Sequence, residues 1–537
     1  MSEQDMQQNE VIEVCFQATA ECADPYNEVD VDVIITAPDG RQDRVPAFWS
    51  GGREWKARLT GAKPGDYRWE TRASSDADHA PHACGGGFTI EPYTGDNPLL
   101  RHGRLRVADS HRHFEHADGT PFFWTGDTWW MALTTRMDWP EGFHALAADR
   151  VAKGFNVIQV VMGPLPDMDW GDPRGNSTAG LPFSDDLRQV RPEYFDAADP
   201  KIAHLVAAGL SPCIVGMWGY YLVRIGVAGV KRFWRYLIAR YGAYPVTWCI
   251  AGEATMPYYL SDTQEADAAA QKKGWTEVMA SVRDTDGYGN LLTIHPPYSG
   301  GVQVEDRGLM DFEMLQSAHN DTESVIVSIT DVGTAVAAEP TMPVIESEIN
   351  YEGSLGRAWQ NIQRLSFYHA VMRGTAGHTY GAVGIWQMNT REEPYGPSPH
   401  GRCWGDTPWR EAAQLPGAGQ VGIGSRFMRQ FPWWELAPQP DRIRFEQDPT
   451  APWRSDADPY APVCLGVPGR LLIVYYPMCW NQPTIRQLEA DTRWRAWYFD
   501  PCNGDRVDLG HVVPSEEGEW SAPHPPETRD WLLVLEA

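Results

Sequence analysis

The sequence predicts a central (β/α)8 TIM barrel flanked by an N-terminal and a C-terminal β-sandwich. Three observations support this fold class. Short alternating runs fill residues 1–100, short apolar strands alternate with longer helical segments over residues 101–435, and β character returns over residues 436–537. A chain of 537 residues is also long enough for two or three domains.

Residues 1–100 have the pattern of an immunoglobulin-like β-sandwich. Alternating stretches such as VDVDVIITAP and DYRWETRA are separated by the turn sequences PDG, SGG and KPGD. Alternation with a period of two places every second side chain on the face that packs in a core. The linker EPYTGDNPLLRHG follows, and after it the hydrophobic period changes.

The barrel is expected to contain eight strands, most of them followed by a segment of helical period. We place the strands at residues 121–127, 156–163, 211–219, 246–253, 291–297, 311–319, 343–348 and 378–386. Intervening segments such as AGVKRFWRYLIARYG and GRAWQNIQRLSFYHAVMRG are long and amphipathic. They are therefore expected to form the outer ring of helices.

The last segment contains the stretches GRLLIVYYP and DWLLVLEA, which predict a second, smaller β-sandwich. Neither flanking region has a cluster of acidic and aromatic residues like that of the barrel, so we expect both to be structural. Carbohydrate binding is the alternative, because small β-sandwiches are common lectin scaffolds.

The charge balance narrows the classes of partner. With 45 Lys and Arg against 72 Asp and Glu, the net charge of −27 disfavours nucleic acid and anionic membranes. The first residues, MSEQDMQQNEVIEV, lack the features of a secretion signal, and no apolar run reaches the ~18 residues of a membrane span. We therefore expect a cytoplasmic protein, and the sequence leaves open whether it forms a homo-oligomer.

The sequence gives no sign of a metal or another cofactor. Nine cysteines without a close C-x-x-C pair argue against a zinc site and a disulfide framework, so free thiols are expected. The acidic segment DMDWGDP (167–173) lacks the register of a calcium loop and is expected to be a surface loop near the barrel mouth. No G-x-G-x-x-G follows a predicted strand, and the sequence has no P-loop lysine motif, G-x-S-x-G nucleophile elbow or H-E-x-x-H zinc motif, so nucleotide binding, acyl transfer and zinc proteolysis lose support.

Two glutamates are the candidate catalytic residues. In a barrel of this type, side chains at the C-terminal ends of the strands converge on one mouth. Glu253 ends the predicted fourth strand and Glu348 the seventh. Cleavage of a glycosidic bond needs such a pair, one carboxyl to protonate the leaving oxygen and one to attack the anomeric carbon or activate water. The alternative for Glu253 is a polar residue that merely begins a loop.

The stretch PVIESEINYEG offers two further glutamates. Strand alternation places Glu346 and Glu348 on the same face, so the pattern alone does not separate them. Glu352 lies beyond the strand, where a loop or helix-capping role is the better interpretation.

Other predicted strand ends carry groups suited to sugar binding. The chain has 24 Trp, 21 Tyr and 17 Phe, and aromatic rings stack on the C–H faces of sugars while amides, imidazoles and carboxylates bind their hydroxyls. For each residue singly, core packing is an equally good interpretation. The substrate-binding candidates are Asp127, Trp130, Trp218, His295, Gln316, His319, Tyr351 and Trp386.

Several motifs together resemble one known family. GTPFFWTGDTWW, VTWCIAGE, LQSAHN, PVIESEINYEG and GHTYGAVGIW are similar to those of the apiosidase-like glycoside hydrolases, and the flanking stretches GREWKARLTGAKPGDYRWET and WYFDPCNGD resemble their β-domains. The resemblance implies a barrel fold and an acid/base at Glu253, where Asp is commoner in the family. It also favours Glu348 over Glu346 as the second carboxylate.

These observations lead to one expected function and two alternatives. We expect an exo-acting, retaining glycosidase that acts on small glycosides or oligosaccharides, with a carbohydrate as its partner. One alternative is a barrel that binds carbohydrate without catalysis. The other is an inverting hydrolase or a transglycosylase that uses the same two carboxylates.

Overall fold

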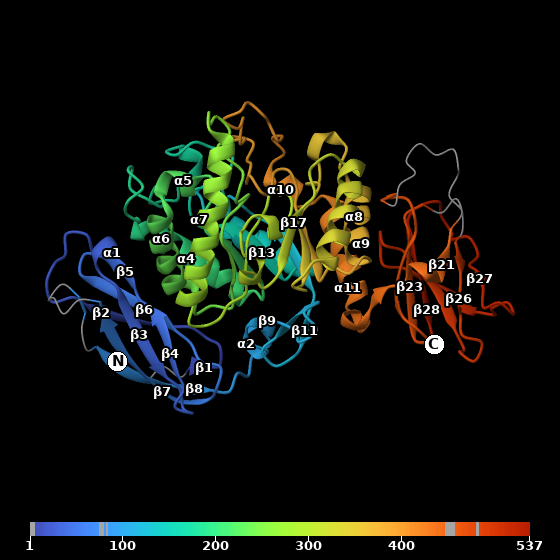
Figure 1. The fold of residues 1–537 in the computed structure, drawn as a ribbon, viewed down its shortest axis with the longest axis horizontal. Coiled ribbons are helices and arrows are strands. Elements are labelled where there is room, and N and C mark those ends of the chain that lie inside the picture. The colour runs from blue at the N-terminus through green and yellow to red at the C-terminus, as the bar shows by residue number, and fades with distance from the viewer. Residues whose placement is uncertain (1–5, 75–79, 82–83, 446–456, 479–482) are drawn as a thin grey trace.

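The computed structural model describes residues 6–74, 80–81, 84–445, 457–478 and 483–537. At its centre, eight parallel strands form a barrel in the order β16-β15-β14-β13-β12-β19-β18-β17 (Figure 1). The two end strands are linked by a backbone hydrogen bond from Asp311 N to Leu292 O of 2.8 Å. The strands are β12 (Trp124–Thr128), β13 (Val157–Val161), β14 (Ser211–Val215), β15 (Thr247–Cys249), β16 (Leu292–Thr293), β17 (Glu313–Gln316), β18 (Val344–Glu348) and β19 (Gly377–Tyr380). The predicted TIM barrel is confirmed.

Most barrel strands are shorter than the apolar runs that predicted them. The run over residues 246–253 contains only the three-residue strand Thr247–Cys249, and the next run contains only Leu292–Thr293. The sequence stays apolar beyond each strand because the first loop residues are buried too: Ile250, Ala251 and Ile294 are 0% exposed. Apolarity therefore marks the buried barrel mouth as well as the strands.

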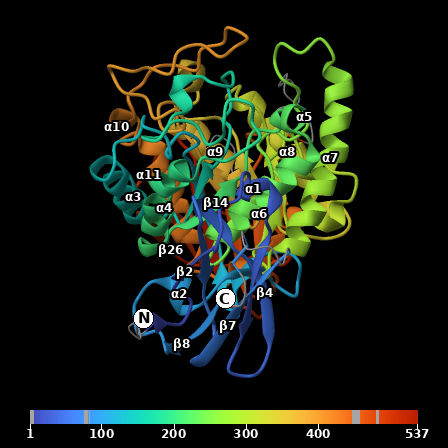
Figure 2. The same ribbon diagram turned by 90° about the vertical axis from the view of Figure 1, so that its left-hand side faces the viewer.

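Helices surround the barrel (Figures 1 and 2). The main ones are α3 (Glu141–Lys153), α4 (Pro192–Ala207), α6 (Val227–Tyr241), α7 (Gln264–Thr285), α8 (Thr322–Ala337), α9 (Gln360–Val371) and α11 (Pro416–Met428), with the short α5 (Tyr221–Ile225) and α10 (Trp409–Ala412) near the mouth. Between β16 and β17 the chain forms the short 3-10 turns η2 (Gly300–Val302) and η3 (Arg307–Leu309) in place of an α-helix. One side of the mouth is therefore built from loop.

A small antiparallel sheet closes the opposite end of the barrel. It consists of β9 (Leu105–Val107), β10 (Phe114–His116) and β11 (Pro121–Phe122), and follows the short α2 (Pro98–Arg101). Phe114 is 0% exposed, and its ring centroid lies 5.0 Å from that of Phe312 and 5.8 Å from that of Trp124. Since both partners stand at the beginnings of strands, Phe114 fills the N-terminal end of the barrel.

The N-terminal region is a β-sandwich that packs against the barrel. Its sheets have the orders β1-β8-β7-β3-β4 and β2-β6-β5, and buried residues of both, including Val33 and Trp55, share one core. The ring of Phe48 lies 5.9 Å from that of Tyr236 on α6. The strands are β1 (Met6–Gln7), β2 (Ile12–Gln17), β3 (Val31–Thr36), β4 (Gln42–Pro46), β5 (Phe48–Gly51), β6 (Glu54–Leu59), β7 (Gly65–Ala73) and β8 (Gly85–Glu91), with α1 (Pro25–Glu28) between them.

The C-terminal region also contains two sheets with a common core, as predicted. Their orders are β20-β22-β23-β28-β25-β26 and β21-β24-β27. Phe499 lies 4.3 Å from Phe427 of α11, and Asp530 forms a 2.7 Å ion pair with Arg364 of α9. The strands are β20 (Ala437–Pro438), β21 (Ile443–Arg444), β22 (Val463–Val467), β23 (Leu471–Tyr476), β24 (Thr484–Ile485), β25 (Arg495–Phe499), β26 (Arg506–His511), β27 (Trp520–Ser521) and β28 (Trp531–Glu536).

Two further sequence expectations concern membranes and thiols. Among the described residues, no helix combines the length and apolarity that crossing a bilayer requires. The thiols that are free of disulfide bonds include Cys15, Cys22, Cys213, Cys249, Cys403, Cys464 and Cys502. Cys479 lies outside the described residues.

Candidate active site

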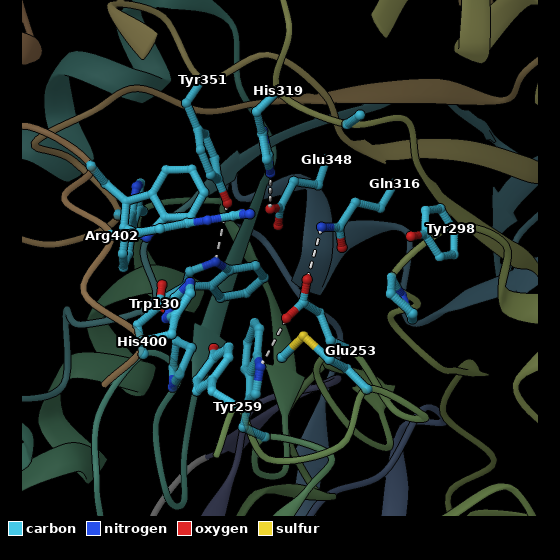
Figure 3. A pocket seen from close by; sticks show the side chains of 18 of the residues that line it. Trp130, Glu253, Tyr259, Tyr298, Gln316, His319, Glu348, Tyr351, His400 and Arg402 are labelled. Atoms are coloured by element: carbon cyan, nitrogen blue, oxygen red, sulfur yellow. Dashed lines mark hydrogen bonds and ion pairs between the residues drawn. The ribbon is translucent and has the colours of Figure 1, made fainter. Parts of the chain in front are cut away.

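A cavity of about 960 Å³ opens at the C-terminal ends of the barrel strands (Figure 3). Both candidate catalytic residues, Glu253 and Glu348, line it. Six of the predicted substrate-binding residues line it as well: Trp130, Trp218, Gln316, His319, Tyr351 and Trp386. Residues that are far apart in the sequence therefore meet in one hollow, as expected where parallel strands end at a common edge.

Glu253 is held by two hydrogen-bond donors. Trp218 Nε1 donates to its Oε2 at 3.1 Å, and Gln316 Nε2 donates to its Oε1 at 2.9 Å. Its backbone has a φ of +42°, a left-handed conformation in the loop that follows β15. Burial, followed by the negative charge of Glu348, raises the pKa of Glu253 to about 7. At neutral pH this carboxyl group therefore carries a proton in a large fraction of molecules.

Glu348 lies between two histidines. His295 Nε2 is 3.3 Å from its Oε2, and His319 Nε2 is 3.1 Å from its Oε1. Burial alone would raise the pKa of Glu348, but hydrogen bonding and positive charge from these rings outweigh it and lower the pKa to about 2. Glu348 is therefore ionised at neutral pH, in contrast to Glu253.

Tyr351 lies among three other rings of the cavity lining, those of Trp130, His319 and Trp386. Its hydroxyl accepts a hydrogen bond of 3.1 Å from Trp130 Nε1, and its ring stacks on His319 at 5.0 Å with an interplanar angle of 11° (Figure 3). A Cβ atom at Gly381 on the neighbouring strand end would lie 2.1 Å from the Tyr351 ring. Trp386 packs on the same tyrosine at 6.1 Å. Glycine at position 381 is thus required for this ring to reach the cavity.

Glu346 does not share the orientation of Glu348, contrary to simple alternation. In the pairing of β17 with β18, Leu315 lies opposite Glu346 and Gln316 opposite Glu348, so Ser347 is an extra residue. Such a bulge changes the direction of the following side chain. Glu346 is 0% exposed and accepts hydrogen bonds from Ser317 and Ser328 on the helix side, at 2.7 and 2.6 Å. The bulge therefore aims Glu348 alone into the cavity.

Two predicted substrate-binding residues do not line the cavity. Asp127 is 0% exposed, and its Oδ2 accepts bonds from Arg150 Nε at 2.6 Å and Trp129 Nε1 at 2.7 Å. An aspartate at a strand end is equally suited to anchoring a buried arginine, which is its role here. His295 is also 0% exposed, and its Nε2 lies 3.3 Å from Oε2 of Glu348. It is therefore placed to position this carboxylate rather than to touch a ligand.

Glu352 has the capping role expected for it. It accepts hydrogen bonds from Tyr380 Oη at 2.6 Å and from the backbone N of Gly417 at 3.0 Å, in the first turn of α11. A carboxylate at the N-terminus of a helix interacts favourably with the helix dipole.

The sequence pattern missed the cavity residues that stand on loops. They include Tyr259, Tyr298, His400, Arg402 and Trp404. His400 stacks on Tyr259 at 4.5 Å with an interplanar angle of 5°. Loops after strands have no periodicity, so only their aromatic and charged composition could have indicated this role. The acidic segment 167–173 does reach the mouth, because Asp167 lines the cavity. Asp169 accepts a hydrogen bond from Tyr258, and Asp172 accepts one from Arg174.

Comparison with known proteins identifies the family of this chain. The sequence model of the apiosidase-like catalytic domain matches residues 108–435, more than half of the chain. The chain belongs to the apiosidase-like family of glycoside hydrolases. The predicted family and glycosidase class are thereby confirmed. A domain of unknown function, DUF5060, matches residues 5–74 of the N-terminal sandwich. A search of curated proteins found no match.

Solved structures of glycoside hydrolases share this apiosidase-like fold at low sequence identity. One glycoside hydrolase is 22% identical with a TM-score of 0.64, covering 82% of this chain and 98% of its own. A family 5 glycoside hydrolase from Bacteroides vulgatus is 22% identical with a TM-score of 0.66, covering 82% and 94%. Another Bacteroides vulgatus structure assigned to the glycoside hydrolases is 16% identical with a TM-score of 0.69, covering 99% and 100%.

The arrangement can perform acid and nucleophile chemistry on one ligand. The pKa of the partly buried Glu253 is raised to about 7 and that of Glu348 is lowered to about 2, and both side chains line the same cavity. Aromatic rings from Trp130, Trp218 and Tyr351 surround them. Environments that drive the pKa values of two carboxyl groups apart are the usual means of assigning them different roles.

Proposed function

We propose that this apiosidase-like protein is a retaining, exo-acting glycosidase in which Glu253 is the acid/base and Glu348 the nucleophile. The observation that carries the proposal is geometric: both carboxyl groups line one cavity, where Trp218 and Gln316 hold Glu253 and two histidines flank Glu348. Burial beside Glu348 raises the pKa of Glu253 to about 7, and the histidines lower that of Glu348 to about 2. A retaining mechanism needs a proton on one carboxyl and a negative charge on the other at the start of the reaction.

In the first step, Glu348 attacks the anomeric carbon while Glu253 protonates the leaving oxygen. The bond to the leaving group breaks, and a glycosyl ester with Glu348 forms. Once Glu348 has lost its charge, the main electrostatic cause that raises the pKa of Glu253 is removed. The pKa of Glu253 then falls, so after giving up its proton it stays ionised at neutral pH and can accept a proton from the water that hydrolyses the ester.

The neighbouring residues support these roles. Gln316 and Trp218 hold both oxygens of Glu253, which fixes the direction from which a proton is delivered. His295 and His319 hold both oxygens of Glu348 and keep it ionised. Positioned groups of this kind lower the barrier because they require no reorganisation during the reaction.

The substrate is proposed to be a small glycoside, cleaved at its end. The cavity is lined by residues on several loops, among them Tyr259, His400, Arg402 and Leu355. Walls of this kind favour the binding of a terminal sugar over the interior of a long chain. The family name makes apiosides the first glycosides to test, followed by other pentofuranosides and by hexopyranosides in both anomeric forms.

The Glu253→Gln variant tests the acid/base role. Gln cannot donate an acidic proton, so turnover of alkyl glycosides should fall by about 1000-fold, whereas the first step on 4-nitrophenyl glycosides needs little protonation and should be spared. The measurements are steady-state kinetics and the burst of 4-nitrophenol release. Glu346→Gln, which changes a buried glutamate outside the cavity, is the matched control and should stay active. Equal loss on both substrate types would reject the assignment.

A further inference from the structure

The lining of the catalytic cavity changes character toward its rim. The inner part carries the carboxyl, amide and imidazole groups described above. Three large apolar residues, Tyr298, Val302 and Leu355, line the same cavity yet are 66%, 59% and 59% exposed. Exposed apolar side chains that line a binding cavity are available to contact a bound ligand.

These rim residues stand on two short segments. Tyr298 and Val302 belong to the connection between β16 and β17, where 3-10 turns replace an α-helix. Leu355 lies in the 3-10 turn η4 (Ser354–Gly356) after β18, with a φ of +54°. Leucine adopts this backbone conformation at a cost, and burial does not compensate it here. The placement of an apolar side chain at this point therefore needs another explanation.

The opposite wall differs from the rim. His400 and Arg402 lie across the cavity from Tyr298, which is on the side that carries Gln316 (Figure 3). A ligand can therefore meet the His400 and Arg402 side chains on one side and the segment that carries Tyr298 on the other. Gln316 also bonds Glu253, the residue that would protonate the leaving group, so the segment that carries Tyr298 adjoins the leaving-group end of the site.

We infer that the substrate carries an apolar leaving group, an alkyl or aryl aglycone rather than a second sugar. The inference rests on the proposed function, because only a glycosidase has such a leaving group. The hydroxyls of a second sugar would lose water against Val302 and Leu355 without gaining hydrogen bonds. An alkyl or aryl group would instead remove the surface of these side chains from water.

The experiment first identifies the sugar with a panel of 4-nitrophenyl glycosides. For the sugar that is cleaved, kcat/KM is then measured on the methyl, butyl and hexyl glycosides and on the 2-(2-methoxyethoxy)ethyl glycoside. The three alkyl leaving groups have similar basicity, so differences between them report binding. We expect kcat/KM to rise by about tenfold from methyl to hexyl, since burial of two methylene groups is sufficient for that ratio. The ether chain, of similar length to hexyl, should gain less.

Variants of the rim locate the effect. Val302→Ser and Leu355→Asn should each reduce the hexyl-to-methyl ratio of kcat/KM, and asparagine tolerates the positive φ at position 355. Val513→Ser is the control, because Val513 is 81% exposed on the C-terminal domain and does not line the cavity. It should leave the ratio unchanged.

Each result distinguishes the inference from the proposed function. If glycosides are cleaved but the alkyl series is flat, or disaccharides are preferred, the aglycone inference is wrong and the glycosidase proposal stands. If rim variants alter the oligomeric state and leave the ratio unchanged, the rim is a contact between copies of this chain, which also overturns the inference. If no glycoside in the panel is cleaved, both proposals fail.

Discussion

At the scale of single residues, two glutamates of the same chemistry are placed in different environments. Glu253 has amide and indole donors and a carboxylate neighbour, whereas Glu348 has two imidazoles. For Glu253, burial and the negative charge of Glu348 outweigh the hydrogen bond from Gln316 and favour the protonated form, while the two rings beside Glu348 favour the ionised form. The difference in pKa therefore follows from which side chains stand at the neighbouring strand ends.

The pH dependence of activity follows from these pKa values. Glu253 must be protonated, so kcat/KM should fall as the pH rises through about 7, and Glu348 stays ionised down to about pH 2. The hydrogen bond from Gln316 lowers the pKa of Glu253, so Gln316→Leu should move the alkaline limb of the profile to higher pH. A pH profile of kcat/KM measures this shift. An alkaline limb that moves to lower pH would mean that another group controls it.

The sequence alone could identify the residues that end strands. Glu253, Gln316 and Trp218 follow apolar runs and line the cavity as expected. It could not separate Asp127 from them, because a strand-end carboxylate looks the same whether it faces the mouth or pairs with Arg150 in the wall. The partner that decides its role comes from α3, and no local pattern contains that information.

At the scale of elements, local backbone features aim the catalytic side chains. Ser347 forms the bulge that sends Glu346 toward the helices and Glu348 into the cavity. Gly252 allows the Trp218 ring to lie over the backbone beside Glu253, because a Cβ atom there would be 2.3 Å from the ring. Alternation predicts neither feature, since both are departures from regular strand geometry. The observed register therefore had to be known before Glu346 could be excluded from the cavity.

The Gly252→Ala variant tests the second of these features. The added methyl group should displace the Trp218 ring and break its bond to Glu253, which should reduce kcat/KM by about 100-fold. Gly333→Ala is the matched control, because a Cβ atom there meets nothing within 4 Å. It lies within α8 and should raise the free energy of unfolding by about 0.5–1 kcal/mol without affecting activity. Equal kinetics in the two variants would show that Trp218 does not position Glu253.

At the scale of the whole molecule, both flanking domains pack on helices of the barrel. The C-terminal domain does so through Phe499 and Asp530, and the N-terminal sandwich through aromatic rings and an arginine. Tyr26 and Phe48 of the N-terminal sandwich pack on Tyr236 of α6, with ring centroids 6.0 and 5.9 Å away. Arg58 donates a 2.8 Å hydrogen bond to the backbone O of Arg240 and pairs with Asp199. Alternating and helical periods predicted the three parts of the chain, but not these contacts, which depend on side chains from distant segments.

Removal of residues 1–100 should therefore yield insoluble or strongly destabilised protein. The apolar side of α6 would be exposed, and Asp199 and the backbone O of Arg240 would both lose their bonds to Arg58. As a milder test, Phe48→Ala should lower the free energy of unfolding by about 3 kcal/mol in thermal or denaturant unfolding. A soluble barrel with full activity on small substrates would show that the N-terminal domain is dispensable.

The chemical rescue of Glu348→Ala tests the central claim most directly. Loss of the nucleophile should reduce turnover of the 4-nitrophenyl glycoside by at least about 1000-fold. Added azide should fill the vacated space, attack the anomeric carbon and restore part of the release of 4-nitrophenol, giving a glycosyl azide of inverted configuration in the NMR spectrum. Near-normal activity of Glu348→Ala, together with an inactive Glu346→Gln, would contradict the assignment of Glu348 as the nucleophile.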